Sequence, residues 1–241
     1  MRRTWIPAFA GMTVVVSAGM TVVVSAGMTL MFPAMAQEVV VDVGHYAAEP
    51  GVISAGGVPE FEFNLALASE VKKELEKLRL QVRLIGERGD YAVLHHRTRD
   101  ARGADLFVSI HHDSVKERLL PQAGRFAGFS LFVSRANARA KRSLACASAI
   151  GAKLRGAGFT PSRYHADAVL GESRSFADEA NGVHYYDNLA VARSAAMAAV
   201  LVEAGVIVNR EEEQRMRDPA VRGRIAAAVA GGVRECLEGK P

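Results

Sequence analysis

Four residues whose side chains suit metal-assisted hydrolysis occur at widely separated places in this chain of 241 residues. His45 ends the apolar run VVVDVGH, His111 ends the run LFVSIH, and Glu203 ends the run AAVLVE. Glu60 lies in the segment GGVPEFEFNL, which follows the first of these runs. Two imidazoles and one carboxylate are the ligand set of a catalytic zinc site, and a second carboxylate can take a proton from water. These residue types therefore predict a zinc hydrolase.

Other hydrolase signatures are missing from the sequence. It contains neither the H-E-x-x-H motif of zincins nor a G-x-S-x-G nucleophile elbow. The two cysteines, Cys146 and Cys236, do not have the spacing of a zinc site, and neither is placed as a nucleophile. Both fall in predicted helices, where they could form a disulfide in an exported protein or remain buried free thiols.

Predicted strands alternate with predicted helices along most of the chain. The apolar runs predict strands at 39–45, 81–85, 106–111, 128–133 and 198–203. Helical spacing predicts helices from Asn64 as N-cap, at 91–102, at 137–154, and from the Asp218-Pro219 start to about residue 237. This alternation predicts an α/β fold with three αβα layers, in which a mainly parallel central sheet is flanked by helices on both faces. The carboxyl ends of such strands meet at one edge, where ligands collect.

The long segment 156–188 has no helical or strand periodicity. A loop of this length within a compact domain is usually functional. We expect it to lie over or beside the zinc cleft.

Residues 1–36 have the pattern of an export leader. Arg2 and Arg3 precede a long uncharged run that contains the repeated octad GMTVVVSA and ends in Ala-Met-Ala. This ending is typical of a signal peptidase site, whereas the length of the run would also suit a membrane anchor. We expect a cleaved signal peptide, a catalytic domain at 37–241, and a periplasmic or secreted protein. Contact with a membrane is expected only if the leader is retained.

The charge of the domain gives no reason to expect nucleic-acid binding. The net charge of the whole chain is +4, and residues 1–36 contain two Arg and no acidic residue, so the remainder carries +2. Such a near balance differs from the strongly basic surface of nucleic-acid-binding domains.

Taken together, four motifs resemble the zinc-dependent N-acetylmuramoyl-L-alanine amidases of bacterial cell walls. They are VVVDVGH, EFEFNL from Glu60, ADLFVSIH ending at His111, and VLVEAGVIVN around Glu203. The family typically has a DPGHGG-like turn, an E-x-x-x-N-L helix start, an ADLFVSIHAN-like strand and a VLVELGFLSN-like strand. The motifs occur in the same order and at similar distances, and the resemblance covers nearly all of residues 38–240.

The resemblance implies roles for individual residues. His45, Glu60 and His111 resemble the family's zinc ligands, and Glu203 resembles its catalytic glutamate. The implied substrate is peptidoglycan, cut at the amide between N-acetylmuramic acid and L-alanine, and a protein activator is a further expected partner. Two alternatives stay open: another zinc peptidase or deacylase acting on wall fragments, and a non-catalytic peptidoglycan-binding module.

Several neighbouring residues compete for a role at the site. Glu62 is a rival ligand or a first-turn acid of a helix. His112 should point to the opposite side of the strand from His111, and we expect it to be solvated or at the substrate edge. Glu172, in the long loop, is a second possible residue at the substrate edge. Asp42 could accept a hydrogen bond from a ligand histidine or simply end a strand. His95, His96 and Arg97 are expected on a solvated basic helix face. His165 and His184, like Glu172, lie in the long loop and could reach the site, although most polar residues of such a loop do not.

Overall fold

The computed structural model describes residues 21–24, 28–31 and 37–239. Two short antiparallel strands, β1 (Thr21–Val24) and β2 (Met28–Met31), lie in the first part of the chain. The expected leader falls largely outside the described residues and stays a prediction. Among the helices that are described, none is long and apolar enough to cross a membrane.

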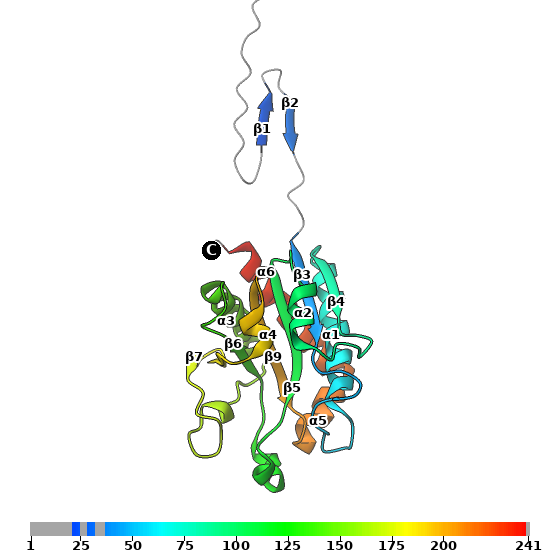
Figure 1. Ribbon diagram of the computed structural model, residues 1–241, viewed down its shortest axis with the longest axis vertical. Helices are drawn as coiled ribbons and strands as arrows, with labels where there is room; N and C mark the ends of the chain where they lie inside the picture. The colour runs from blue at the N-terminus through cyan, green and yellow to red at the C-terminus, as the bar shows by residue number, and fades with distance from the viewer. Residues whose placement is uncertain (1–20, 25–27, 32–36, 240–241) are drawn as a thin grey trace, which may run out of the picture. The chain divides into compact units, whose positions relative to one another are not determined.

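The domain that begins at Gln37 is built on a seven-stranded sheet with the order β4-β3-β5-β9-β6-β8-β7 (Figure 1). Its strands are β3 (Glu38–Val43), β4 (Gln81–Ile85), β5 (Leu106–Asp113), β6 (Ser130–Val133), β7 (Phe176–Asp178), β8 (Val183–Tyr185) and β9 (Ala198–Val206). Strands β4, β3, β5 and β9 are parallel, as expected, whereas β6 is antiparallel to β9 and β7 to β8. The sheet is therefore mixed, and its parallel half contains the strands that carry His111 and Glu203.

Helices cover both faces of the sheet, which confirms the predicted three layers (Figure 1). The helices are α1 (Glu60–Lys77), α2 (Leu94–Asp100), α3 (Ala140–Gly156), α4 (Ala190–Ser194), α5 (Arg210–Arg217) and α6 (Pro219–Glu238). Helices α1, α3 and α6 share the larger core with one face, and the short α2 and α4 lie on the other face. As predicted, α6 starts after Asp218, whose side chain accepts a hydrogen bond from the backbone N–H of Ala220.

Strand alternation explains how the two cores are divided. In β3, Val39, Val41 and Val43 belong to the larger core, while Val40 belongs to the smaller one. The same alternation in β5 places Leu106, Val108 and Ile110 in the larger core. Successive side chains of a strand point to opposite faces, so a strand buried on both sides must be apolar at nearly every position.

The structure corrects the prediction that residues 156–188 are irregular. This segment contains β7, β8 and a short 3-10 helix, η2 (Tyr164–Ala166). Three further elements were not predicted: the helices α4 and α5, and the 3-10 segment η1 (Glu117–Arg125). Strands β7 and β8 have only three residues each, too few to show a period in the sequence.

A disulfide between Cys146 and Cys236 joins α3 to α6, so the cysteines are not free thiols. Both lie in the larger core, and 90 positions separate them in the sequence. A crosslink that closes a loop of this length restricts the unfolded chain strongly.

We expect the double variant Cys146→Ala/Cys236→Ala to lose about 4 kcal/mol of unfolding free energy, because the unfolded chain regains its loop entropy. Guanidinium unfolding, followed by circular dichroism, measures this loss. Dithiothreitol should lower the midpoint of the parent protein and leave that of the double variant unchanged. Equal midpoints for the oxidised parent and the double variant would contradict the stabilising role.

Candidate metal centre

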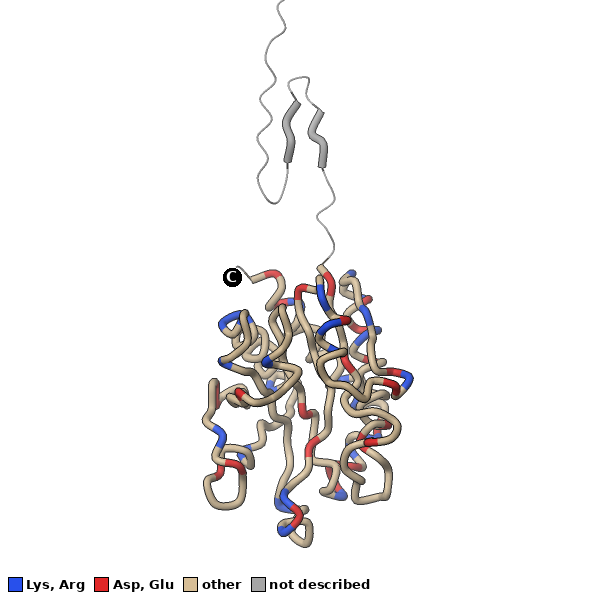
Figure 2. Tube along the Cα trace, in the orientation of Figure 1, with Lys and Arg blue, Asp and Glu red and all other residues tan. Residues whose placement is uncertain are grey.

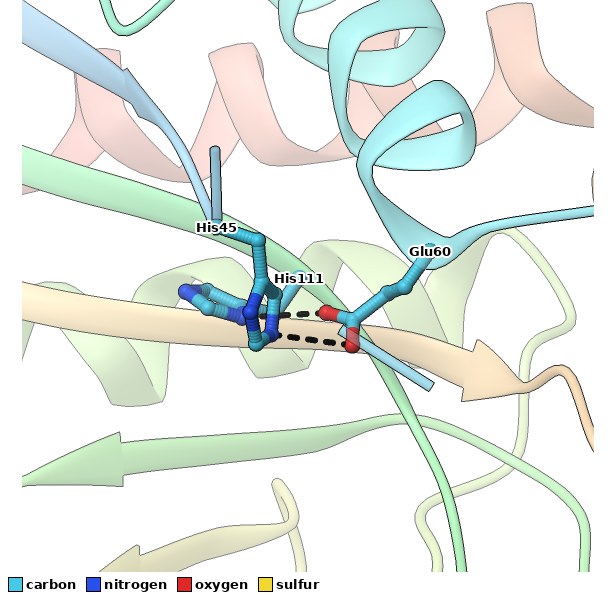
Figure 3. A group of neighbouring side chains, drawn as sticks. All are labelled: His45, Glu60 and His111. Atoms are coloured by element: carbon cyan, nitrogen blue, oxygen red, sulfur yellow. Dashed lines mark hydrogen bonds and ion pairs between the residues drawn. The ribbon is translucent and has the colours of Figure 1, made fainter. Parts of the chain in front are cut away.

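Three predicted residues converge at the carboxyl end of the parallel strands (Figure 3). The Nε2 atom of His45 lies 3.0 Å from one carboxylate oxygen of Glu60, and the Nδ1 atom of His111 lies 3.1 Å from the other. One potential ligand atom from each residue lies within 4.8 Å of those from the other two. These three residues could therefore hold a metal ion, and in the part of the chain that is described no other group of three His, Cys, Asp or Glu does so.

Glu60 is positioned by the first turn of α1, which corrects the predicted helix start at Asn64. The helix begins at Glu60 after Pro59, and Asn64 lies one turn later. Residues four apart share a helix face, so the Asn64 amide reaches the Glu60 carboxylate at 3.0 Å. The same amide also donates to the Gly44 carbonyl at 3.3 Å. Asn64 thus ties the Glu60 carboxylate to the end of β3.

His45 occupies a backbone conformation that is rare outside glycine. Its φ is +66°, so the left-handed conformation in the turn after β3 falls on His45 and not on the preceding Gly44. Gly44 is needed for another reason: a Cβ atom there would lie 2.4 Å from the imidazole ring of His111. The close packing of these two segments brings the His45 and His111 rings to a centroid distance of 5.0 Å.

Arg97 stabilises this turn from inside the protein, which corrects its expected place on a solvated basic face. Its side chain is only 1% exposed and donates to the Asp42 carboxylate at 2.6 Å. It also donates to the backbone carbonyls of Val43 and His45. Asp42 therefore pairs with Arg97, and with the hydroxyl of Ser109, rather than with His45 or His111. Burial raises the pKa of the Asp42 carboxyl, and the Arg97 charge opposes that rise.

Replacing Arg97 by methionine should reduce the unfolding free energy by about 3–5 kcal/mol, since it leaves the Asp42 charge buried without its partner. Urea unfolding at neutral pH measures the change. The matched control is Arg99→Met, because Arg99 is exposed on the same helix and should shift stability by no more than about 0.5 kcal/mol. Similar losses of unfolding free energy in Arg97→Met and Arg99→Met would contradict a stabilising role for the buried Arg97–Asp42 ion pair.

His112 is buried, so the expectation of a solvated side chain at the substrate edge is wrong. It does point away from the side of His111, as predicted, but α1 covers that face of β5. Its Nδ1 atom lies 2.8 Å from the Asn64 side-chain oxygen, and its ring packs on Phe63. Burial lowers the pKa of His112 to about 4, which keeps it neutral. His112 therefore supports the residue that holds Glu60.

Glu203 lies opposite His111 on the neighbouring parallel strand. After this pair the register shifts, because Asp113 pairs with Val206, and β9 contains one extra residue. Such a bulge bends a strand and re-aims side chains, and bulges are frequent beside active sites. One carboxylate oxygen of Glu203 is buried without a hydrogen-bond partner among the described residues.

The electrostatic environments of the two glutamates push their pKa values apart. Burial raises the pKa of Glu203 well above its usual value, and the charges of Asp113, Glu60 and Glu172 raise it further. Burial also works against ionisation of Glu60, but hydrogen bonds from His111 and His45 outweigh it and lower the pKa of Glu60. One carboxylate is thus held ionised between imidazoles, and the other takes up a proton more readily than an ordinary glutamate.

Other candidate residues lie outside the triad. Glu62 is exposed on α1, and His95 is exposed on α2. Glu172 forms a second cluster with His165, while His184 is fully buried with no hydrogen-bond partner in the described chain. No pattern in the sequence indicates the burial of Arg97 or the contact between His165 and Asp113. Figure 2 shows basic and acidic residues interspersed along the domain.

Comparison with known sequences gives one family. The profile of the family Amidase_3, described as N-acetylmuramoyl-L-alanine amidase, matches residues 39–235. The chain is 29% identical over 220 residues to N-acetylmuramoyl-L-alanine amidase AmiC of Neisseria meningitidis, covering 83% of this chain and 52% of that protein. It is 28% identical over 217 residues to N-acetylmuramoyl-L-alanine amidase AmiA of Escherichia coli, covering 81% of this chain and 74% of that protein. The chain thus spans about half the length of the meningococcal relative.

The fold is also shared with solved structures. The catalytic domain of CwlV, an N-acetylmuramoyl-L-alanine amidase from Bacillus (Paenibacillus) polymyxa var. colistinus, superposes with a TM-score of 0.66 at 28% identity. The match covers 85% of this chain and 99% of that domain. The described domain therefore corresponds to nearly the whole of a single catalytic domain.

Proposed function

This chain belongs to the N-acetylmuramoyl-L-alanine amidase family, and from that premise we propose that it is a zinc-dependent hydrolase of peptidoglycan. The bond cleaved is the amide between N-acetylmuramic acid and the L-alanine of the stem peptide. The observation that carries this proposal is the convergence of His45, Glu60 and His111 beside Glu203.

The donor set fits zinc. Two neutral imidazoles and one carboxylate, with a further position open, are the ligands of many catalytic zinc sites. When bound, the ion supplies Lewis-acid chemistry, which polarises an amide carbonyl and lowers the pKa of water to about 7. Glu60 would serve as the anionic ligand, and Asn64 keeps its carboxylate turned toward the two histidines.

Glu203 would act as the general base and then as the general acid. Its raised pKa lets it accept a proton from the attacking water and pass that proton to the leaving amine nitrogen of L-alanine. The unpartnered carboxylate oxygen is available for this transfer, since no described side chain binds it. A module that only bound peptidoglycan would have no use for a base placed beside the ligand set.

Export is part of the proposal. The disulfide between α3 and α6 supports it, because structural disulfides persist mainly in oxidising compartments outside the cytosol. We expect the signal peptide to be cleaved after Ala36, which gives a periplasmic or secreted domain that begins at Gln37. A protein activator stays a prediction.

Mass spectrometry of purified peptidoglycan digested by the zinc-loaded protein tests the reaction. We expect free stem peptides that begin with L-alanine, and glycan strands that retain the lactyl group. Protein treated with a chelator is the control and should release none. Cleavage within the stem peptide, or loss of acetyl groups from the glycan, would instead indicate a peptidase or deacetylase; binding without products would indicate a binding module.

A further inference from the structure

A second polar cluster lies at the same end of the sheet as the metal centre. His165, from η2, is buried between two carboxylates. Its Nε2 atom lies 2.6 Å from the Oδ2 atom of Asp113, and its Nδ1 atom lies 3.0 Å from the Oε2 atom of Glu172. Glu172 also accepts a hydrogen bond from Arg174. Both ring nitrogens of His165 thus face an acidic oxygen.

This geometry favours a cation at His165. A neutral imidazole has one donor and one acceptor nitrogen, so it can donate to only one of two ionised carboxylates. Burial lowers the pKa of His165, but the two carboxylates outweigh it and raise that pKa to about 9. Hydrogen bonds from His165 and Arg174 also lower the pKa of Glu172 to about 2. At neutral pH His165 is therefore an imidazolium, and it lies between the side chains of Asp113 and Glu172.

The cluster joins the long loop to the catalytic strand. Asp113 is two residues beyond His111 on β5 and, after the register shift, pairs with Val206, three residues beyond Glu203 on β9. The charges of Asp113 and Glu172 are both among those that act on Glu203. His165 therefore connects the segment 162–175 to the part of the sheet where the base is placed.

A small separate core joins the segment 162–175 to the segment 114–127, which follows β5. Its buried members are Val115, Leu119, Phe126, Tyr164 and Val206. The Tyr164 hydroxyl accepts a hydrogen bond from the backbone N–H of Lys116 at 2.8 Å, and Arg118 donates to the carbonyl of Val169 at 2.9 Å. The segments 114–127 and 162–175 thus pack together as one unit. His165 connects this unit to β5 through Asp113.

Resting on the proposed function, we propose that His165 is a positioning residue for amide hydrolysis, whose imidazolium holds Asp113 and Glu172 in fixed places beside Glu203. It acts through these two carboxylates and does not itself touch the substrate. The groups that face it from the surrounding elements are Asp113 of β5, Glu172 and Arg174 of the loop, Tyr164 of η2, Phe132 of β6 and His184 of β8.

The test measures zinc content and the pH dependence of kcat for the full chain on a soluble muropeptide. His165→Gln should keep about one zinc per chain, because no metal ligand is altered. Its kcat at pH 7 should fall about ten- to a hundredfold, the cost of small misplacements in an active site. Zinc loss from His165→Gln, or a kcat within twofold of the parent value, would overturn the proposal.

Glu172→Gln provides a readout that a purely structural role would not move. In the parent protein, kcat should fall as the pH rises through about 9, because His165 loses its proton there. Removing one carboxylate weakens the preference for the imidazolium. The alkaline limb of the pH profile, where kcat falls, should therefore move about one pH unit or more toward the ordinary histidine pKa of about 6.5. An unchanged alkaline limb would contradict the proposal.

His184→Gln is the matched control. His184 is also buried, and its ring lies 5.8 Å from that of His165, but neither of its nitrogens has a hydrogen-bond partner among the described residues. This variant should keep kcat within about twofold and the alkaline limb near 9, even if its melting temperature falls. A loss equal to that of His165→Gln would show a general packing effect and overturn the proposal.

Failure of the proposed function is distinguishable from failure of this inference. A zinc-loaded parent protein that releases no stem peptide would reject the amidase reaction. NMR titration of the His165 ring needs no substrate, and its midpoint should lie near 9 in the parent and fall in Glu172→Gln. A midpoint near 6.5 in the parent would refute the bridging imidazolium whatever the reaction.

Discussion

Glu203→Gln should retain its metal while hydrolysing peptidoglycan about two to four orders of magnitude more slowly than the parent protein, the usual contribution of a positioned acid–base group. Glutamine keeps the shape of the side chain but cannot take up the proton of the attacking water. Glu203 is also outside the group of three potential ligands, so zinc binding should be unaffected. The decisive measurement pairs elemental analysis with turnover on the same preparation.

Two glutamate variants serve as comparisons for Glu203→Gln. Glu60→Gln replaces the anionic ligand, so it should weaken zinc binding as well as turnover. Glu62→Gln changes an exposed residue on the same helix and should leave both unchanged. A zinc-free Glu203→Gln protein would place Glu203 among the ligands, and a fully active one would remove it from the mechanism.

His45→Ala and His111→Ala should each abolish both zinc binding and activity. Each variant leaves one imidazole and one carboxylate, too few protein ligands for a stable catalytic zinc site. We expect about one zinc ion per chain in the parent protein and almost none in either variant. Inductively coupled plasma mass spectrometry after dialysis measures the metal, and thermal unfolding with and without added zinc measures its stabilising effect.

The matched control for these variants is His95→Ala. His95 is exposed on α2 and contributes nothing to the triad, so the variant should keep its zinc and its rate. Added zinc should raise the melting temperature of the parent and of His95→Ala, since a ligand that binds only the folded state stabilises it. Full zinc content in His45→Ala or His111→Ala would refute the ligand assignment.

The layers of the fold, and the edge of the sheet at which the candidate site lies, could be predicted from the sequence alone. Strands buried on both faces are apolar at nearly every position, which made β3, β5 and β9 recognisable. Parallel strands end at one edge of a sheet, so His111 and Glu203 could be expected together there before any contact was known. The start of α6 could also be predicted, because the N-cap that begins a helix is a local interaction.

Features that depend on contacts between distant segments, such as burial and disulfide pairing, could be seen only in the tertiary structure. The sequence does not show which helix covers a strand, and α1 turned His112 from an expected surface residue into a buried support for Asn64. Similarly, an arginine among polar neighbours on α2 is expected to be solvated, and only the contact with Asp42 explains its burial. The choice between a disulfide and free thiols needed α3 packed against α6. Burial and pairing of polar groups are properties of the packed chain, so no local pattern in the sequence could have fixed them.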